Sequence, residues 1–168
     1  MKDNFKQERV NLAAAFRWAA RLNMHEAIAN HFSLAVSDDG SQFLLNPIGM
    51  HFSQICASDL LLLDSNNAET MSQPNAPDAT AWAIHGAMHR NNLHARCILH
   101  VHPKYATILA CLEDKVMKPI DQNTMRFYEK VSIDYDYDGM GVGDEAERLC
   151  TILGDNSVLL MGNHGVLT

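Results

Sequence analysis

The sequence contains little that would suit a membrane, a nucleic acid or a secreted scaffold. No apolar run approaches the roughly 20 residues that a membrane-spanning helix requires, and the polar N-terminus lacks the apolar core of a signal peptide. Basic residues are also few, since 13 Lys and Arg stand against 20 Asp and Glu and give a net charge of −7. A nucleic-acid-binding protein usually has a basic surface. We therefore expect a cytoplasmic protein with no membrane span and no nucleic-acid partner.

Cysteines are scarce and poorly spaced for cross-linking. The sequence has four, none of them in a C-x-x-C pair: Cys56, Cys97, Cys111 and Cys150. This spacing matches neither a zinc knuckle nor a disulfide framework. Because free thiols are often buried and the cytosol keeps them reduced, we expect four reduced core residues.

Internal repeats and low-complexity tracts are absent as well. The chain has 168 residues, 47% of them hydrophobic and 20% charged, which is typical of a globular protein. This length suits one domain, so we expect a single domain over residues 1–168. The last four residues, Gly165-Val166-Leu167-Thr168, have the pattern of an interrupted strand, and we expect a C-terminal segment to follow them.

Strand and helix patterns alternate along the chain. Asp38-Asp39-Gly40 is typical of a hairpin turn between two strands, and Asp78 suits the N-cap of a helix. The alternation predicts a mixed α/β domain in which helices cover a sheet. The expected helices are 6–29, 79–91, 104–112 and 144–153, and the expected strands are 31–36, 42–46, 60–63, 97–102, 131–137, 158–161 and 165–168.

The sharpest local signal among the nine histidines is Leu99-His100-Val101-His102-Pro103. Residues two apart on a strand project from the same face, so His100 and His102 should point together while Cys97, Leu99 and Val101 face the core. Two adjacent imidazoles on an apolar strand are costly unless something occupies them. A divalent metal would do so. The alternative is a pair of hydrogen-bonded histidines at the sheet margin.

A third histidine follows the apolar run 158–161, in Asn163-His164-Gly165. The neighbouring glycines allow a close approach to a ligand. Alone, His164 would be read as a turn residue. With His100 and His102 it completes a set of three histidines, which with one open position is the arrangement of catalytic zinc sites.

His85 and His89 form a rival pair, four residues apart on one helix face. The glutamate of the H-E-x-x-H metal motif is absent, so we favour packing or hydrogen bonding for these two. His25, His51 and His94 have no evident partner in the sequence, and we expect surface or structural roles.

Taken together, these residues resemble the class II aldolase/adducin family, and the pattern is nearest to its bacterial adducin-like branch. The most specific element is the His-x-His strand followed about 60 residues later by Asn-His-Gly. The matching segments are Asn30-His31-Phe32-Ser33, Asn46-Pro47-Ile48-Gly49, the helix 80–89, His100-Val101-His102-Pro103 and Met161-Gly162-Asn163-His164-Gly165-Val166.

The resemblance implies a three-layer α/β/α fold around a mostly antiparallel sheet. It also implies that His100, His102 and His164 bind a divalent metal, usually zinc, with manganese, iron or cobalt as alternatives. In the enzymes of the family this metal polarises a carbonyl of a small substrate so that an enediolate can form. Family members form cyclic tetramers, and a homotetramer agrees with the aromatic residues Phe127, Tyr128, Tyr135 and Tyr137 if they are exposed. Otherwise these are ordinary core aromatics.

The sequence departs from the sugar-phosphate aldolases at the acid/base. Their catalytic glutamate is replaced here by Ala81, which cannot transfer a proton. Ser33, Gly49 and Thr80 keep chemistry comparable to the family's substrate-binding positions. His85 lies one helical turn after Ala81, and His31 lies where the family has an asparagine that contacts substrate. Either histidine could act as the base.

Two functional hypotheses follow. The first is a metal-dependent lyase that acts on a small oxygenated substrate by aldol cleavage or decarboxylation. The second is a non-catalytic, adducin-like assembly module that keeps the fold. The three histidines favour the first hypothesis, and Ala81 favours the second.

Overall fold

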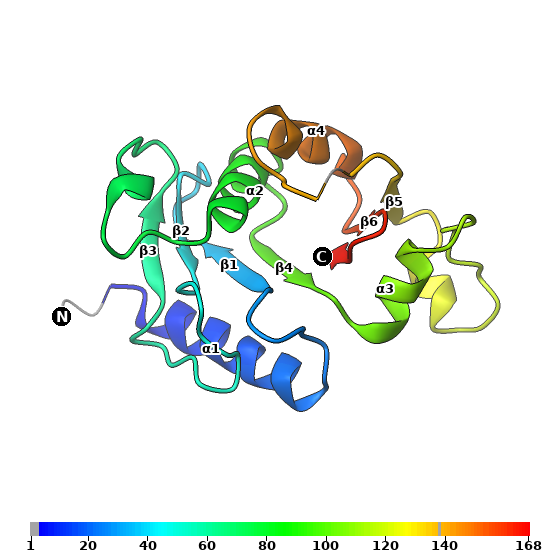
Figure 1. The fold of residues 1–168 in the computed structure, drawn as a ribbon, viewed down its shortest axis with the longest axis horizontal. Coiled ribbons are helices and arrows are strands. Elements are labelled where there is room, and N and C mark those ends of the chain that lie inside the picture. The colour runs from blue at the N-terminus through cyan, green and yellow to red at the C-terminus, as the bar shows by residue number, and fades with distance from the viewer. Residues whose placement is uncertain (1–3, 138) are drawn as a thin grey trace.

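One seven-stranded sheet organises the molecule (Figure 1). The structure is a computed structural model, and it describes residues 4–137 and 139–168. The strand order is β3-β2-β1-β4-β7-β6-β5, and all neighbours pair antiparallel except β5 and β6, which are parallel. The strands are β1 (His31–Ala35), β2 (Gln42–Leu45), β3 (Leu61–Asp64), β4 (Cys97–Val101), β5 (Val131–Asp134), β6 (Val158–Met161) and β7 (Val166–Leu167).

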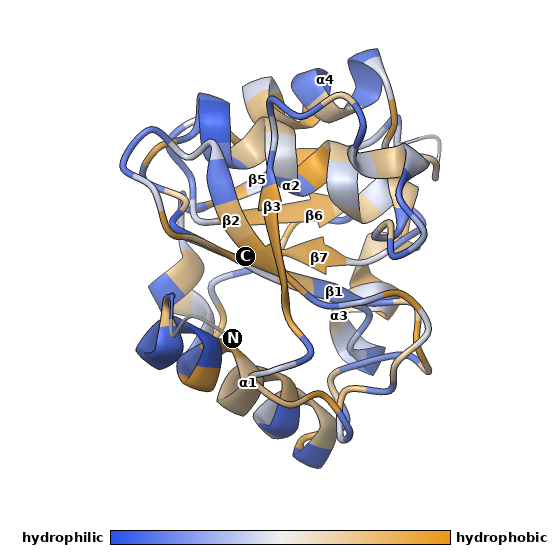
Figure 2. Cartoon of the chain, turned by 90° about the vertical axis from the view of Figure 1, so that its left-hand side faces the viewer, coloured by the Kyte–Doolittle hydropathy of each residue, from blue (hydrophilic) through white to orange (hydrophobic). Residues whose placement is uncertain are grey.

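Helices cover both faces of this sheet (Figure 2). One apolar cluster joins α1 and α3 to one face through Phe16, Ala110 and Leu160. A second cluster joins α2 and α4 to the opposite face through Met88 and Leu149. The expected three-layer α/β/α arrangement with a mostly antiparallel sheet is therefore confirmed. The helices are α1 (Lys6–Arg21), α2 (Ala79–Asn91), α3 (Lys104–Ala110) and α4 (Asp144–Leu153), with short 3₁₀ turns η1 (Thr70–Ser72) and η2 (Thr124–Phe127).

Alternation along the central strands decides which side chains reach which helix layer. Phe32 and Val101 belong to the cluster under α1 and α3, whereas Ile98 belongs to the cluster under α2 and α4. Because successive side chains on a strand point to opposite faces, His31 and His100 face the α2 layer. The antiparallel register places these two histidines directly opposite each other.

The first helix is shorter than predicted. The sequence pattern predicts a helix over 6–29, but α1 ends at Arg21. Asn23 and Ala27 have φ values of 52° and 46°, in the left-handed region that commonly ends a helix. The segment 22–30 therefore leaves the helix axis and reaches the end of β4, where it contributes Glu26 to the site described below.

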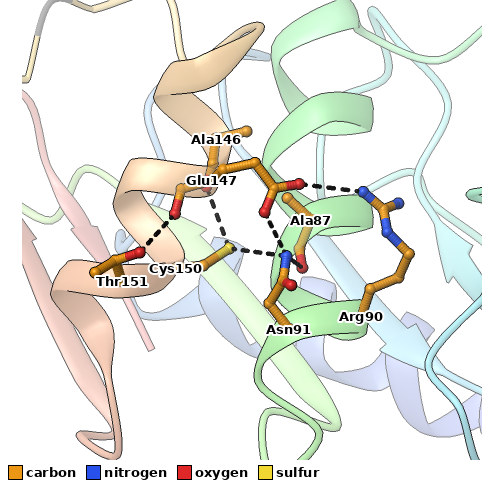
Figure 3. A network of polar contacts seen from close by, with 7 residues as sticks. All are labelled: Ala87, Arg90, Asn91, Ala146, Glu147, Cys150 and Thr151. Atoms are coloured by element: carbon orange, nitrogen blue, oxygen red, sulfur yellow. Dashed lines mark hydrogen bonds and ion pairs between the residues drawn. The ribbon is translucent and has the colours of Figure 1, made fainter.

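The helix α2 is held at both ends. Asp78 is its N-cap as predicted, with the side-chain Oδ1 accepting a hydrogen bond from the Ala81 amide at 2.9 Å. Near its C-terminus, Asn91 donates to the Ala87 carbonyl at 3.0 Å and to Glu147 of α4 at 2.6 Å (Figure 3). These contacts fix the position of α2, which carries His85 and His89 over the sheet.

The prediction that all four cysteines lie in the core is wrong. Only Cys150 is buried, while Cys56, Cys97 and Cys111 are exposed, and all four are free thiols. Cys97 begins β4 and therefore lies at the sheet margin rather than in its interior. In the part of the chain that the structure describes, no helix is long and apolar enough to cross a membrane.

Candidate metal centre

Three histidines converge at the end of β4. The Nε2 atoms of His100 and His102 are 3.0 Å apart, those of His102 and His164 are 3.2 Å apart, and those of His164 and His100 are 3.1 Å apart. His100 lies on β4, His102 follows its last residue, and His164 lies in the turn between β6 and β7. The sequence pattern thus pointed to three side chains that the fold brings to one point.

A tight turn delivers His164 to the other two rings. The Met161 amide donates to the Gly165 carbonyl at 2.9 Å, and the His164 amide donates to the Met161 carbonyl at 3.1 Å. A Cβ at position 165 would lie 2.5 Å from Cδ2 of His102. Glycine is therefore required at this position, because any side chain would push His102 away.

Glu26 orients His102 and was missed by the sequence analysis. Its carboxylate lies 2.7 Å from Nδ1 of His102, and its own amide donates to the side chain of Asn30 at 2.6 Å. A carboxylate only accepts hydrogen bonds, so Nδ1 of His102 carries a hydrogen and Nε2 is the ring nitrogen turned to the cluster. Glu26 is 76 positions from His102 and lies in a segment predicted as helix, so the sequence offered no signal for this contact.

The cluster fits a divalent cation. Zinc–nitrogen bonds of 2.0–2.1 Å in tetrahedral geometry place neighbouring nitrogens about 3.3 Å apart, close to the observed spacing. Burial lowers the pKa of His164 to about 4 and that of His100 well below its ordinary value, with the neighbouring histidines adding to both shifts. Both rings are thus neutral at neutral pH, as metal ligands must be.

A cleft of about 240 Å³ opens beside the three histidines. Its size suits a small molecule rather than a drug-sized ligand. Polar residues from six separate segments line it, among them Asp78, Asn30 and Asn46. The lining residues are Ile28, Ala29, Asn30, His31, Asn46, Ile48, Asp78, Thr80, Ala81, His100, His102, Tyr137, Gly139 and His164.

The two histidines considered as a base lie at different depths. His31 lines the cleft, and its ring stacks on that of His100 with centroids 4.7 Å apart. His85 is completely buried, does not line the cleft, and contacts Nδ1 of His31 through its Nε2 at 2.7 Å. Only His31 is therefore placed to touch a molecule in the cleft.

The residues predicted to bind substrate also lie at different positions relative to the cleft. Thr80 lines the cleft and donates from its hydroxyl to the Met140 carbonyl at 2.9 Å. Ser33 has no exposed surface, and its hydroxyl contacts His85 and, at 2.7 Å, His89. Gly49 has a φ of 78° in the turn after Ile48 and does not itself line the cleft. Ser33 thus lies beneath the cleft.

Two further sequence-based expectations can be compared with the structure. His25 and His51, for which we expected surface or structural roles, contact each other through their Nε2 atoms at 2.8 Å. Phe127 and Tyr128 are exposed as expected. Tyr137 instead lines the cleft, with its ring 4.7 Å from that of His164.

Comparisons with known proteins agree with this architecture. The model of the class II aldolase and adducin N-terminal domain matches residues 10–168. A crystal structure of an aldolase II superfamily protein from Pseudomonas syringae superimposes with a TM-score of 0.84 at 32% identity, covering 95% of this chain and 64% of that one.

Curated relatives include enzymes and adducins. Decarboxylase NovR of Streptomyces niveus is 26% identical over 172 residues, which cover 99% of this chain and 63% of that protein. Alpha-adducin of Rattus norvegicus is 27% identical over 164 residues, 95% of this chain and 22% of that protein. The chain therefore spans less than two thirds of the length of these relatives. With a family model that matches nearly all of its residues, the chain belongs to the class II aldolase and adducin family.

Proposed function

We propose that this chain forms the metal-binding domain of a lyase that cleaves or decarboxylates a small oxygenated substrate. The observation that carries the proposal is the convergence of the Nε2 atoms of His100, His102 and His164 within 3.0–3.2 Å of one another at the edge of a cleft. Such a group of converging imidazoles binds a divalent cation such as zinc, with manganese, iron or cobalt as alternatives. A bound ion supplies Lewis-acid polarisation of a substrate oxygen.

His31 is the base in this proposal. It is the ring that both lines the cleft and stacks on His100, so it faces a substrate next to the metal ligands. Burial lowers its pKa to about 4, an effect that the nearby Asp78 carboxylate partly opposes. The ring is therefore neutral and able to accept a proton at neutral pH. His85 supports His31 from behind through the contact at 2.7 Å.

The other polar groups of the cleft orient the substrate. Thr80 presents its side chain at the start of α2, and the Asn46 side chain is held by the Phe32 amide at 3.1 Å. Gly49 borders this region at the turn after Ile48, where its φ of 78° suits glycine. These groups recognise hydroxyl and carbonyl oxygens rather than apolar surface.

We further propose a homotetramer in the cytoplasm. The aromatic rings Phe127, Tyr128 and Tyr135 are 42%, 53% and 56% exposed, and aromatic residues are enriched at interfaces. The exposed thiols of Cys56, Cys97 and Cys111 suit a reducing compartment. Light scattering of the purified protein tests the assembly, and a monomeric mass at micromolar concentration would contradict it.

Metal analysis followed by an activity screen tests the lyase proposal. We expect about one divalent ion per purified chain, and its loss in a His102→Ala variant. The exposed His94 provides the matched control, since His94→Ala should keep the metal. Retro-aldol and decarboxylation assays with small hydroxy and keto acids should give activity that a chelator abolishes and added metal restores.

One observation favours a second function. Ala81 lines the cleft at the position of the family's catalytic glutamate, and the chain is similar to alpha-adducin. A non-catalytic assembly module would show no turnover with any substrate even when fully loaded with metal. A His31→Gln variant separates the two functions, because it should abolish lyase activity but leave assembly unchanged.

A further inference from the structure

A continuous chain of polar side chains runs beneath the cleft. It starts at the Ala95 carbonyl, which lies 2.9 Å from Nδ1 of His89. Nε2 of His89 lies 2.7 Å from the Ser33 hydroxyl, which also contacts Nδ1 of His85. Nε2 of His85 lies 2.7 Å from Nδ1 of His31, at the cleft. The three inner residues of this chain are at most 1% exposed.

The two inner rings, His85 and His89, each hold one hydrogen at neutral pH. Burial lowers the pKa of His89 to about 4, with Arg96 adding to the shift and the contact with Ala95 opposing it. Burial also lowers the pKa of His85 well below its ordinary value. Neutral imidazole has one nitrogen that donates and one that accepts.

The Ala95 carbonyl then sets the direction of every hydrogen bond. A carbonyl only accepts, so the hydrogen of His89 is on Nδ1 and its Nε2 accepts from Ser33. The single hydroxyl hydrogen of Ser33 is used there, so Ser33 accepts from Nδ1 of His85.

The same reasoning continues to the cleft. Nε2 of His85 has no hydrogen left and must accept from Nδ1 of His31. The reverse order would put lone pairs of His89 and Ala95 face to face, which is costly for buried groups. The Ala95 carbonyl, at one end of this series of hydrogen bonds, therefore determines which nitrogen of His31 carries the hydrogen at the other end.

We propose that Ser33, His85 and His89 are positioning residues that hold His31 as the tautomer with hydrogen on Nδ1 and a bare Nε2 at the cleft. In the described part of the chain, Nε2 of His31 has no hydrogen-bond partner, so its lone pair is available to a molecule in the cleft. The use of this lone pair as a base rests on the proposed function. The tautomer itself does not, because the hydrogen bonds that fix it exist without metal or substrate.

Nitrogen NMR of the metal-free chain tests the proposal. With ¹⁵N-labelled histidine at neutral pH, two-bond correlations to the ring protons distinguish protonated from bare ring nitrogens. We expect His31, His85 and His89 each to carry the hydrogen on Nδ1 and to show Nε2 as the bare nitrogen. A hydrogen on Nε2 of His31, or a doubly protonated ring in the chain, would overturn the proposal.

A Ser33→Ala variant tests the link between the rings. His89 should keep its hydrogen on Nδ1 because Ala95 still requires it, whereas His85 and His31 should now populate both tautomers. Ser132→Ala is the matched control, since this hydroxyl on β5 contacts the Leu153 carbonyl at 3.2 Å and no histidine. Unchanged single tautomers of His85 and His31 in Ser33→Ala would contradict the proposal.

The proposal and the lyase function fail in distinguishable ways. If Ser33→Ala does not fold, the tautomers of the unsubstituted chain still decide the proposal. Zinc titration and turnover are measured on separate samples, so a chain with the expected tautomers but no metal or activity would refute only the lyase function.

Discussion

The molecule contains two groups of histidines that differ in how their nitrogens are satisfied. In the buried group, His85 and His89 use both ring nitrogens in hydrogen bonds with Ala95, Ser33 and His31. In the convergent group, the three Nε2 atoms face one another at 3.0–3.2 Å, and the buried Nδ1 of His100 has no partner among the residues that the structure describes. The buried group is complete without a ligand, whereas the converging Nε2 atoms of the second group are placed to share one bound cation.

Histidine therefore has two different roles in neighbouring parts of the structure, one in a hydrogen-bond network and one in the candidate metal site. His31 and His100 are paired across β1 and β4, yet Nδ1 of His31 faces the buried group while Nε2 of His100 faces the other ligands. The difference lies in the partners that α2 and the β6–β7 turn bring to each ring. Histidine content alone does not distinguish a structural network from a metal site.

Acid should produce the largest effect, because burial lowers the pKa of histidines in both groups. The pKa values of His31 and His89 are lowered to about 4 in the folded chain from about 6.5 when unfolded. The unfolded chain thus binds more protons between these values, and the free energy of unfolding falls as pH decreases from about 6.5 to about 4, by about 1.4 kcal/mol per pH unit for each ring. Urea unfolding of metal-free protein across this range measures it.

A variant measures how much of that effect comes from the buried group. His89→Gln removes one of the rings, so the stability of this variant should depend less steeply on pH. An equally steep dependence would mean that other groups cause the acid sensitivity.

Loss of one convergent ligand should have the next largest effect. His100→Ala removes a nitrogen from the site, and the zinc dissociation constant should rise at least about 100-fold, since even the loss of a residue that only supports a ligand costs 10–100-fold. Competition with a chelating dye measures the constant. His89→Gln should leave it unchanged, and equal losses in both variants would show that the two groups are not separate.

Ser33→Ala should reduce stability more than metal affinity. The substitution leaves Nδ1–H of His85 and Nε2 of His89 without their hydroxyl partner at a buried position. An unsatisfied buried polar group costs about 1–3 kcal/mol. Urea denaturation should show this loss, while the zinc dissociation constant stays at its original value. A loss of zinc binding without a loss of stability would contradict this prediction.

The smallest effect is expected from Glu26→Ala. Glu26 supports His102 at 2.7 Å, but its side chain is 66% exposed, so we expect zinc affinity to fall about tenfold, the lower end of the range for such residues. Glu113→Ala, another exposed glutamate, is the control. Unchanged affinity in Glu26→Ala would mean that the backbone alone orients His102.

Short-range patterns predicted most of the fold. Helix α4 and strand β6 have the predicted ends, because strand alternation, helical periodicity and glycine at turns are local properties. The end of α1 was not predictable in this way. Ala27 has no intrinsic preference for the left-handed conformation it adopts at a φ of 46°, so contacts of the segment 22–30 with the rest of the chain must impose it.

The sequence by itself determined the metal candidates, because the strand period places His100 and His102 together and the glycine at 165 marks a close approach to His164. Only the tertiary structure decided how the remaining groups are used. It carried Glu26 to His102, and it joined Ser33 of β1 to His85 and His89 of α2. Hydrogen-bond partners 50 to 80 positions apart leave no periodic signal in a sequence, because they depend on how strands and helices pack rather than on where each begins.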